Sequence, residues 1–255
     1  MKHLIACRIR SYGRHQDRGW SHLPQLGIYH VEADLPGNDA QAQRLRQRLS
    51  ENGLSVNSFE GSIRIDQPNA ADLFQSQAET CNAFDTRFMF VSVKAGELDR
   101  QLAYDRMRQV GDVAAAHGIT VVMETHPDLI TNGRIAKQSM KAINHPQVRV
   151  NFDTANVHFY NENTRTEDEL AQCIDYVAAV HLKDSTGIPR AFDFPVLGQG
   201  IVDFPMVMQM LDDHGFTGPC TLELEGTAGV EFSEPEQLQH IEKSVAYLRG
   251  IGLMD

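Results

Sequence analysis

The chain has 255 residues, of which 42% are hydrophobic and 22% charged, as in ordinary globular proteins. These proportions exclude a disordered chain, a collagen-like repeat and a small disulfide-bonded scaffold. The formal net charge is −11. Nucleic acids and anionic membrane surfaces attract basic proteins, so both are disfavoured as partners.

The sequence carries no targeting or spanning segment that we recognise. No apolar run approaches the roughly 18–20 residues that a membrane-spanning helix needs. The apolar part of the N-terminal segment stops at Arg8 and Arg10, which is too short for a signal-peptide core. We therefore expect a cytoplasmic protein. Four cysteines lie in apolar surroundings without CxxC spacing, so we expect buried free thiols at Cys7, Cys81, Cys173 and Cys220.

Short β-branched or apolar runs alternate with longer helical patterns along the whole chain. The eight runs predict strands at 4–9, 28–33, 54–59, 87–93, 119–124, 148–152, 177–182 and 220–224. Among the helical patterns, those over 40–51, 98–117 and 204–214 are followed by Gly53, Gly118 and Gly215. Each glycine introduces the next strand, as expected for a helix-ending residue in a short connection.

This alternation indicates βαβ units and a parallel sheet. Eight such units in about 250 residues match the usual size of a TIM barrel. We therefore predict an α/β protein, a single (β/α)8 TIM barrel forming one domain over residues 1–255. A doubly wound sheet is the alternative, but no G-x-G-x-x-G follows the first run.

In a parallel barrel the active site lies at the C-terminal ends of the strands. The fifth to eighth runs end in Glu124, Asp153, His181 and Glu223. Three carboxylates that converge at one mouth repel each other, and a divalent cation relieves that repulsion. Oxygen and imidazole ligands without cysteine favour Mn²⁺, with Mg²⁺, Co²⁺ or Zn²⁺ as alternatives, over a structural zinc site. The alternative is that these groups only form ion pairs with Lys183 and arginines.

The order Glu, Asp, His, Glu resembles the sugar isomerase/epimerase branch of the xylose isomerase-like TIM-barrel superfamily, over nearly the whole chain. Further shared features are Glu32, His-Leu-Lys-Asp at 181–184, Gly-Gln-Gly-Ile-Val-Asp-Phe at 198–204, and Gly218. The resemblance implies that Glu124, Asp153, His181 and Glu223 bind one divalent metal ion. It also implies that Glu124 and Glu223 form the catalytic acid/base pair. Barrels of this kind commonly form homodimers or tetramers.

The implied activity is isomerisation or epimerisation of a small ketose, keto-sugar or sugar phosphate through a metal-stabilised enediolate. One glutamate removes a proton beside the carbonyl and the other returns one on the opposite face. The first alternative is a lyase that expels a β-hydroxyl, as in inosose dehydratases. An alternative of another class is a non-catalytic, sugar-binding barrel subunit.

Four residues near the strand ends are expected to contact the substrate: His126, Asn156, Lys183 and Arg190. Many epimerases of this type have Asp-x-x-His where this chain has Asp153-Thr-Ala-Asn156, and an amide can bond a sugar hydroxyl. Glu225 should lie at the rim, outside the metal shell. The superfamily also contains endonuclease IV, but Asn156 and the acidic charge disfavour a DNA-repair role. Residues 11–22, with the single tryptophan Trp20, could fold over the mouth as a lid.

Overall fold

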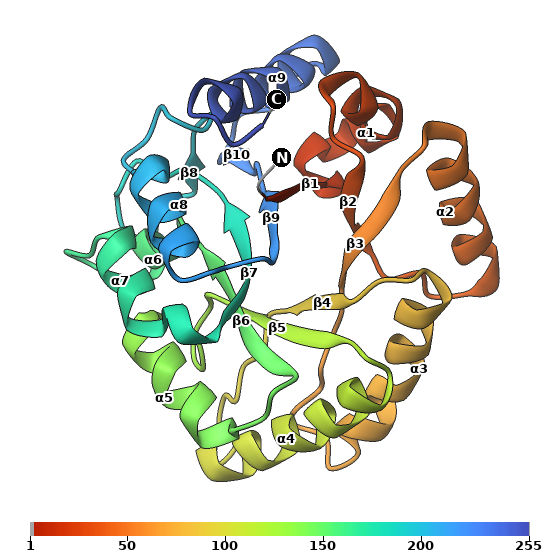
Figure 1. Ribbon diagram of the computed structural model, residues 1–255, viewed down its shortest axis with the longest axis vertical. Helices are drawn as coiled ribbons and strands as arrows, with labels where there is room; N and C mark the ends of the chain where they lie inside the picture. The colour runs from red at the N-terminus through yellow and green to blue at the C-terminus, as the bar shows by residue number, and fades with distance from the viewer. Residues whose placement is uncertain (1–2, 255) are drawn as a thin grey trace.

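The computed structural model describes residues 3–254, whose eight parallel strands close into a barrel inside a ring of helices (Figure 1). Neighbouring strands follow chain order around the barrel, and the last strand pairs with the first. The barrel strands are β1 (Leu4–Arg8), β2 (His30–Asp34), β3 (Ser55–Glu60), β4 (Phe88–Val91), β5 (Thr120–Glu124), β6 (Val148–Asp153), β7 (Val177–Leu182) and β9 (Pro219–Leu222). The predicted (β/α)8 barrel is confirmed, and each predicted run overlaps one of these strands.

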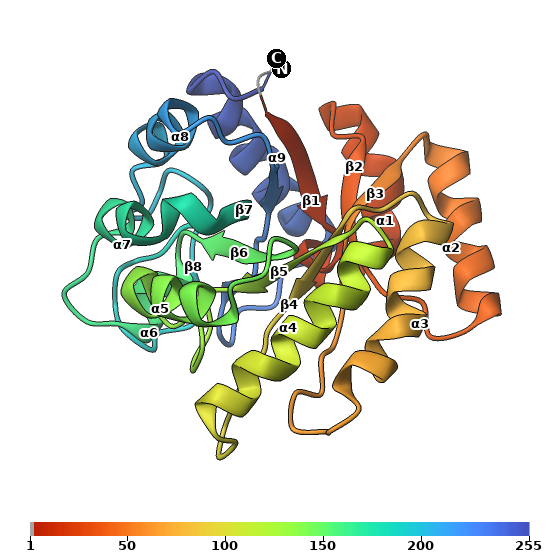
Figure 2. The ribbon, with the colours of Figure 1, turned by 60° about the horizontal axis from the view of Figure 1, so that its bottom comes forward.

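The helices lie outside the strands, as the turned view in Figure 2 shows. They are α1 (Gln16–His22), α2 (Asp39–Asn52), α3 (Ala70–Ala83), α4 (Arg100–Ala116), α5 (Gly133–Ile143), α6 (Asn156–Tyr160), α7 (Thr166–Cys173), α8 (Phe204–Asp213) and α9 (Glu234–Gly250). Three 3₁₀ helices, at Ile9–His15, Leu23–Leu26 and Ile174–Tyr176, and a two-stranded antiparallel sheet of β8 (Asp193–Phe194) and β10 (Gly226–Thr227) complete the described elements. The predicted helices 40–51, 98–117 and 204–214 match α2, α4 and α8 to within two residues.

The apolar core lies mainly between the strands and the helices. A second, small cluster of Phe90, Val122 and Ala179 fills the inside of the barrel. Side chains alternate between the two faces of a strand. The inward face of β5 therefore passes from Val122 to Glu124, and that of β7 from Ala179 to His181. The barrel interior thus changes from apolar to ionisable toward the strand ends, which positions the site.

Residues 11–22 are not an irregular loop. They fold into helical turns that pack against α9, where the Gln237 side chain donates to the Ser11 carbonyl and His22 contacts Glu242. Trp20 is buried, with the Arg48 guanidinium 5.5 Å from its ring. Trp20 therefore serves as a packing anchor. Ser11, Gly13, Arg14 and His15 line a cavity beside Glu223 and Glu225, and a lid role for this segment stays a prediction.

Two further expectations can be compared with residues 3–254. All four cysteines are buried and free, as predicted. No helix in this part of the chain combines the length and the apolar character that crossing a membrane requires.

Candidate metal and substrate site

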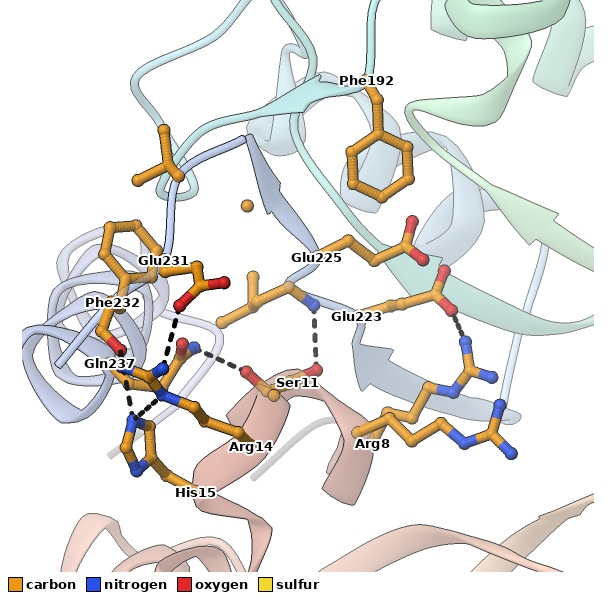
Figure 3. Close-up of a pocket in the computed structure, with 15 residues that line it drawn as sticks. Arg8, Ser11, Arg14, His15, Phe192, Glu223, Glu225, Glu231, Phe232 and Gln237 are labelled. Carbon is orange, nitrogen blue, oxygen red and sulfur yellow. Dashed lines mark hydrogen bonds and ion pairs between the residues drawn. The ribbon is translucent and has the colours of Figure 1, made fainter. Parts of the chain in front are cut away.

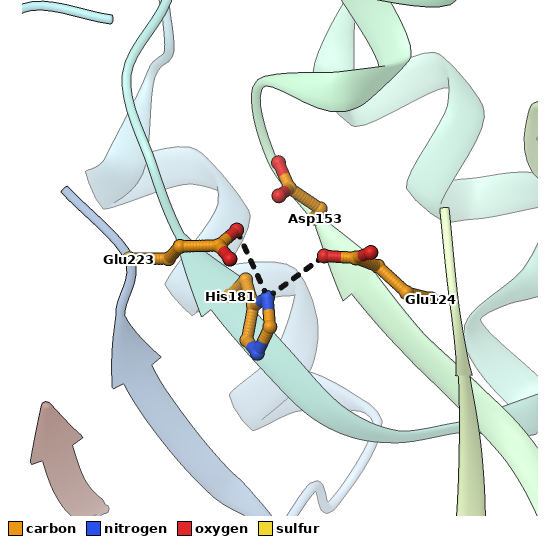
Figure 4. Close-up of side chains that lie close together, drawn as sticks. All are labelled: Glu124, Asp153, His181 and Glu223. Atoms are coloured by element: carbon orange, nitrogen blue, oxygen red, sulfur yellow. Dashed lines mark hydrogen bonds and ion pairs between the residues drawn. The ribbon is translucent and has the colours of Figure 1, made fainter. Parts of the chain in front are cut away.

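Four side chains from successive strands meet at one point at the C-terminal end of the barrel (Figure 4). They are Glu124, Asp153, His181 and Glu223. One ligand atom from each lies within 4.8 Å of those of the other three, and all four residues are buried. The convergence predicted from the strand ends is therefore present.

His181 is held between carboxylates on both sides of its ring. Its Nδ1 atom lies 3.1 Å from Glu124 Oε1 and 3.2 Å from Glu223 Oε2, whereas Nε2 lies 3.2 Å from Glu32 Oε1. Burial alone would lower the pKa of His181, but the charge of Glu32 and the hydrogen bonds to Glu124 and Glu32 raise it to about 9. Nδ1 therefore faces the cluster, while Glu32 orients the ring from behind.

Glu124 is fixed by donors on its other side. Ser92 Oγ donates to Glu124 Oε2 at 2.8 Å, and His126 Nδ1 lies 2.5 Å from the same oxygen. Burial tends to raise the pKa of Glu124, but the contacts with His126 and His181 hold it well below the usual range. Glu124 is consequently a carboxylate at neutral pH, as both a metal ligand and a base must be.

The ion pairs that the sequence left as an alternative are present as well. Lys183 Nζ lies 3.2 Å from Asp153 Oδ2, 3.0 Å from Glu223 Oε2 and 2.5 Å from Glu225 Oε2. Arg8 at the end of β1 bonds Glu223 and Glu60. These two cations leave the carboxylates of the site only partly neutralised.

The balance of charged side chains around the cluster indicates whether a divalent ion fits there. Six carboxylates surround the site, those of Glu32, Glu60, Glu124, Asp153, Glu223 and Glu225, against the two permanent cations Arg8 and Lys183. With His181 neutral, as a metal ligand must be, four negative charges remain in excess. With His181 protonated, as its raised pKa implies for the metal-free protein, three remain. Four of the six carboxylates are buried, whereas Glu60 and Glu225 are partly exposed. Buried charges of one sign need a compensating charge, and three oxygens with one imidazole suit a hard or borderline divalent ion. The donor set therefore fits such an ion.

A cavity of about 270 Å³ opens above the cluster. Its lining includes the predicted residues Glu124, His126, Asn156, Lys183 and Glu223. Aromatic rings form much of the remaining wall, from Phe90, Phe159, Tyr160, Phe192 and Phe194. The cavity thus combines polar groups near the cluster with apolar ring faces, as sugar-sized ligand sites do.

A second cavity of about 420 Å³ adjoins the first toward α9 (Figure 3). The two share Arg8, Phe192, Glu223 and Glu225. Figure 3 shows Glu223 and Glu225 side by side, with Arg14 and His15 near Phe232. The outer cavity is therefore a continuation of the mouth toward solvent.

Arg190 differs from the other predicted contacts. It lies in the exposed part of the connection after β7, with a φ of 61°, and lines neither cavity. Its predicted contact with a substrate stays a prediction. Asn156 begins α6, and its Oδ1 lies 3.2 Å from Lys183 Nζ, so these two predicted contacts are neighbours.

The sequence reasoning missed Arg8, Glu60 and Ser92. Arg8 and Glu60 are the last residues of β1 and β3, so the same strand-end rule would have found them had it been applied to all eight runs. Ser92 follows β4 directly. Together they add one cation, one carboxylate and one hydroxyl to the site.

The closed barrel and its buried cluster of possible metal ligands can be compared with known families. The model of the xylose isomerase-like TIM barrel family matches residues 22–251. The chain belongs to this family.

One curated protein and two solved structures are similar to this chain. An L-ribulose-5-phosphate 3-epimerase from Salmonella paratyphi B is 28% identical over 122 residues, 47% of this chain and 41% of that protein. The chain therefore matches less than half the length of this curated relative. The D-psicose 3-epimerase of Clostridium cellulolyticum H10 has a TM-score of 0.74 at 15% identity, over 100% of this chain and 99% of that one. A probable 3-DHS dehydratase from Bacillus anthracis also has a TM-score of 0.74, at 16% identity over 98% and 99% of the two chains. At such low identities the two solved structures show the shared fold.

Proposed function

We propose that the protein is a metal-dependent sugar isomerase, more narrowly an epimerase of a small ketose. The observation that carries the proposal is the convergence of two buried glutamates, Glu124 and Glu223, on one imidazole and one aspartate beneath a sugar-sized cavity. The family relationship and the 3-epimerase relatives support the same reaction class.

The cluster residues Glu124, Asp153, His181 and Glu223 would hold the ion, with Mn²⁺ the ion we favour. When bound, a divalent ion supplies positive charge beside the ketose oxygens and so acidifies the neighbouring C–H bond. No other part of the site offers comparable charge, because Arg8 and Lys183 are already paired with carboxylates.

The two glutamates supply the proton transfers. One carboxylate takes the proton from the carbon beside the carbonyl, and the electron pair moves to the carbonyl oxygen. The other glutamate, which is ionised at rest and takes up a proton from solvent during the cycle, returns that proton to the opposite face of the carbon. Glu124 approaches the cavity from β5 and Glu223 from the end of β9, so the two reach the substrate from different strands.

Neighbouring side chains would orient the ketose. His126, Asn156 and Lys183 line the cavity and can bond hydroxyl oxygens, Lys183 in exchange for one of its carboxylate contacts. Lys183 Nζ lies 4.6 Å from the centre of the Phe194 ring, so the ammonium group lies over an apolar wall of the cavity. The aromatic rings would exclude water from the reacting carbon.

Proton exchange in D₂O tests the proposal. The protein loaded with Mg²⁺, which does not broaden NMR signals, should catalyse the replacement of hydrogen by deuterium on the carbon beside the carbonyl of a ketose. Glu124→Gln and Glu223→Gln should each slow exchange by about 10² or more. Glu79→Gln, an exposed site on α3, is the matched control.

The outcomes separate the alternatives. A new enone absorbance with loss of water would indicate a dehydratase instead of an epimerase. Exchange that both glutamine variants leave unchanged would refute the acid/base roles. Ketose binding without any exchange would favour a non-catalytic sugar-binding barrel.

A further inference from the structure

We infer that the site selects neutral, unphosphorylated ketoses and discriminates against ketose phosphates. The inference rests on the proposed function for its ligand class, and it differs from what the name of the L-ribulose-5-phosphate 3-epimerase relative suggests. Two independent features carry it: the charge of the site and the occupation of its backbone donors.

The charge balance remains negative after an ion is added. A divalent ion bound with neutral His181 would reduce the excess of four carboxylate charges to two. Extending the count to the rim leaves the net charge the same. Arg10 contacts Glu60 as well as Asp34 and is offset in the count by Asp34, and Arg14 is offset by Glu231. A phosphate ester adds about −1.5 to −2 charges at neutral pH, by analogy with phosphoserine, so binding it here meets repulsion.

The two cations that line the cavity, Arg8 and Lys183, already form ion pairs with carboxylates of the site. The two ends of the Arg8 guanidinium bond Glu223 and Glu60. The Lys183 ammonium contacts Asp153, Glu223 and Glu225. A phosphate would have to displace carboxylates of the site from both groups.

The second feature is the glycine-rich connection after β7. In TIM barrels, connections at this place often bind phosphates through free backbone N–H groups. Here the buried carboxylate of Asp184 fills the loop. Asp184 accepts hydrogen bonds from the backbone N–H groups of Ser185, Gly198, Gly200 and Val202 at 2.8–3.2 Å. A Cβ atom on Gly200 would lie 2.2 Å from Asp184 Oδ1, so the loop is closed tightly around this carboxylate.

The nearby helix N-termini are occupied in the same way. Asp153 Oδ1 accepts from the N–H groups of Ala155 and Asn156 at the start of α6. Asp203 caps α8 through the N–H of Met206. The protein's own carboxylates therefore fill the backbone positions where a phosphate would be expected after β6 and β7.

Matched ligand pairs test the inference by binding. Calorimetry on the Mg²⁺-loaded protein would compare D-ribulose with D-ribulose 5-phosphate and D-fructose with D-fructose 6-phosphate. We expect each free ketose to bind about tenfold more tightly than its phosphate, since a repulsion of this kind at intermediate dielectric exceeds the thermal energy. The ratio should shrink as salt is added, because screening weakens repulsion.

Charge variants test the cause. The double variant Glu60→Gln with Glu225→Gln should reduce the preference for the free ketose several-fold, whereas Glu79→Gln should leave it unchanged. The inference is overturned if the phosphates bind as tightly as the free ketoses, if no ketose binds, or if the double variant leaves the ratio intact. Deuterium exchange into the ketose is measured in a separate experiment on the same protein. A neutral preference without exchange would refute the proposed function and uphold this inference.

Discussion

His181 Nε2 lies 3.2 Å from Glu32 Oε1, and both side chains are buried inside the barrel. Glu32 stands on β2 and His181 on β7, so the contact spans the barrel interior. A carboxylate that accepts the second N–H of a histidine fixes its tautomer and increases its basicity as a ligand. Glu32 is therefore a positioning residue for the metal centre.

Glu32→Gln should weaken metal binding about 10- to 100-fold, because the ring loses the charge that orients it. Competition with a fluorescent chelator measures the affinity. Glu51→Gln on the exposed face of α2 serves as the control. An unchanged affinity in the Glu32 variant would remove this residue from the metal centre.

Metal binding should release a proton from His181. The pKa of its imidazole is raised to about 9 in the metal-free protein, so the ring carries a proton at pH 7.5. A metal ion needs the neutral ring, and the apparent affinity should therefore rise with pH by up to about tenfold per unit, levelling off above pH 9. Titration calorimetry in buffers of different ionisation enthalpy counts the protons released. Zero release at pH 7.5 would contradict the arrangement.

The same pKa has a consequence for the metal-free protein. Because the pKa of folded His181 lies above the ordinary value of 6.5, protonation stabilises the fold. This contribution is fully present below pH 6.5 and is lost as the pH rises toward 9. Urea denaturation in EDTA at pH 6.5 and 9 should show the loss, and His181→Ala should abolish that part of the pH dependence.

Removing the metal should lower stability. An ion present at 100 times its Kd stabilises the folded state by about 2.7 kcal/mol. Thermal unfolding with Mn²⁺ and with EDTA measures the difference. Asp153→Ala should remove most of the increment, while a full increment in this variant would show that the ion binds elsewhere.

Asp184→Ala should destabilise the fold by about 3 kcal/mol or more, because four buried N–H groups lose a charged acceptor. Asp213→Ala, at the exposed end of α8, should change stability by less than about 0.5 kcal/mol. Denaturant midpoints compare the two. Equal effects would mean that Asp184 does not organise the loop.

Local sequence patterns were sufficient to predict the barrel and part of the site. Each strand is a short apolar run, and strand alternation with the barrel rule places Glu124 and His181 without knowledge of distant contacts. The role of Glu32 could not be derived in this way. Its partner is 149 residues away along the chain, and only the closure of the barrel brings the two together.

Residues 11–22 show a second limit of prediction from the sequence. A polar segment with one tryptophan is compatible with a mobile loop and with a packed helix, and the difference depends on α9, which lies at the other end of the chain. Arg190 is exposed and lines neither cavity, so sequence and structure together leave its contact with a substrate a prediction. The oligomeric state and cytoplasmic location stay predictions.

Anomalous diffraction from crystals soaked in Mn²⁺ would show whether the four side chains bind one ion. We expect one strong peak among Glu124, Asp153, Glu223 and His181 Nδ1, at about 2.0–2.3 Å from each ligand atom. A peak elsewhere, or none at saturating Mn²⁺, would contradict it.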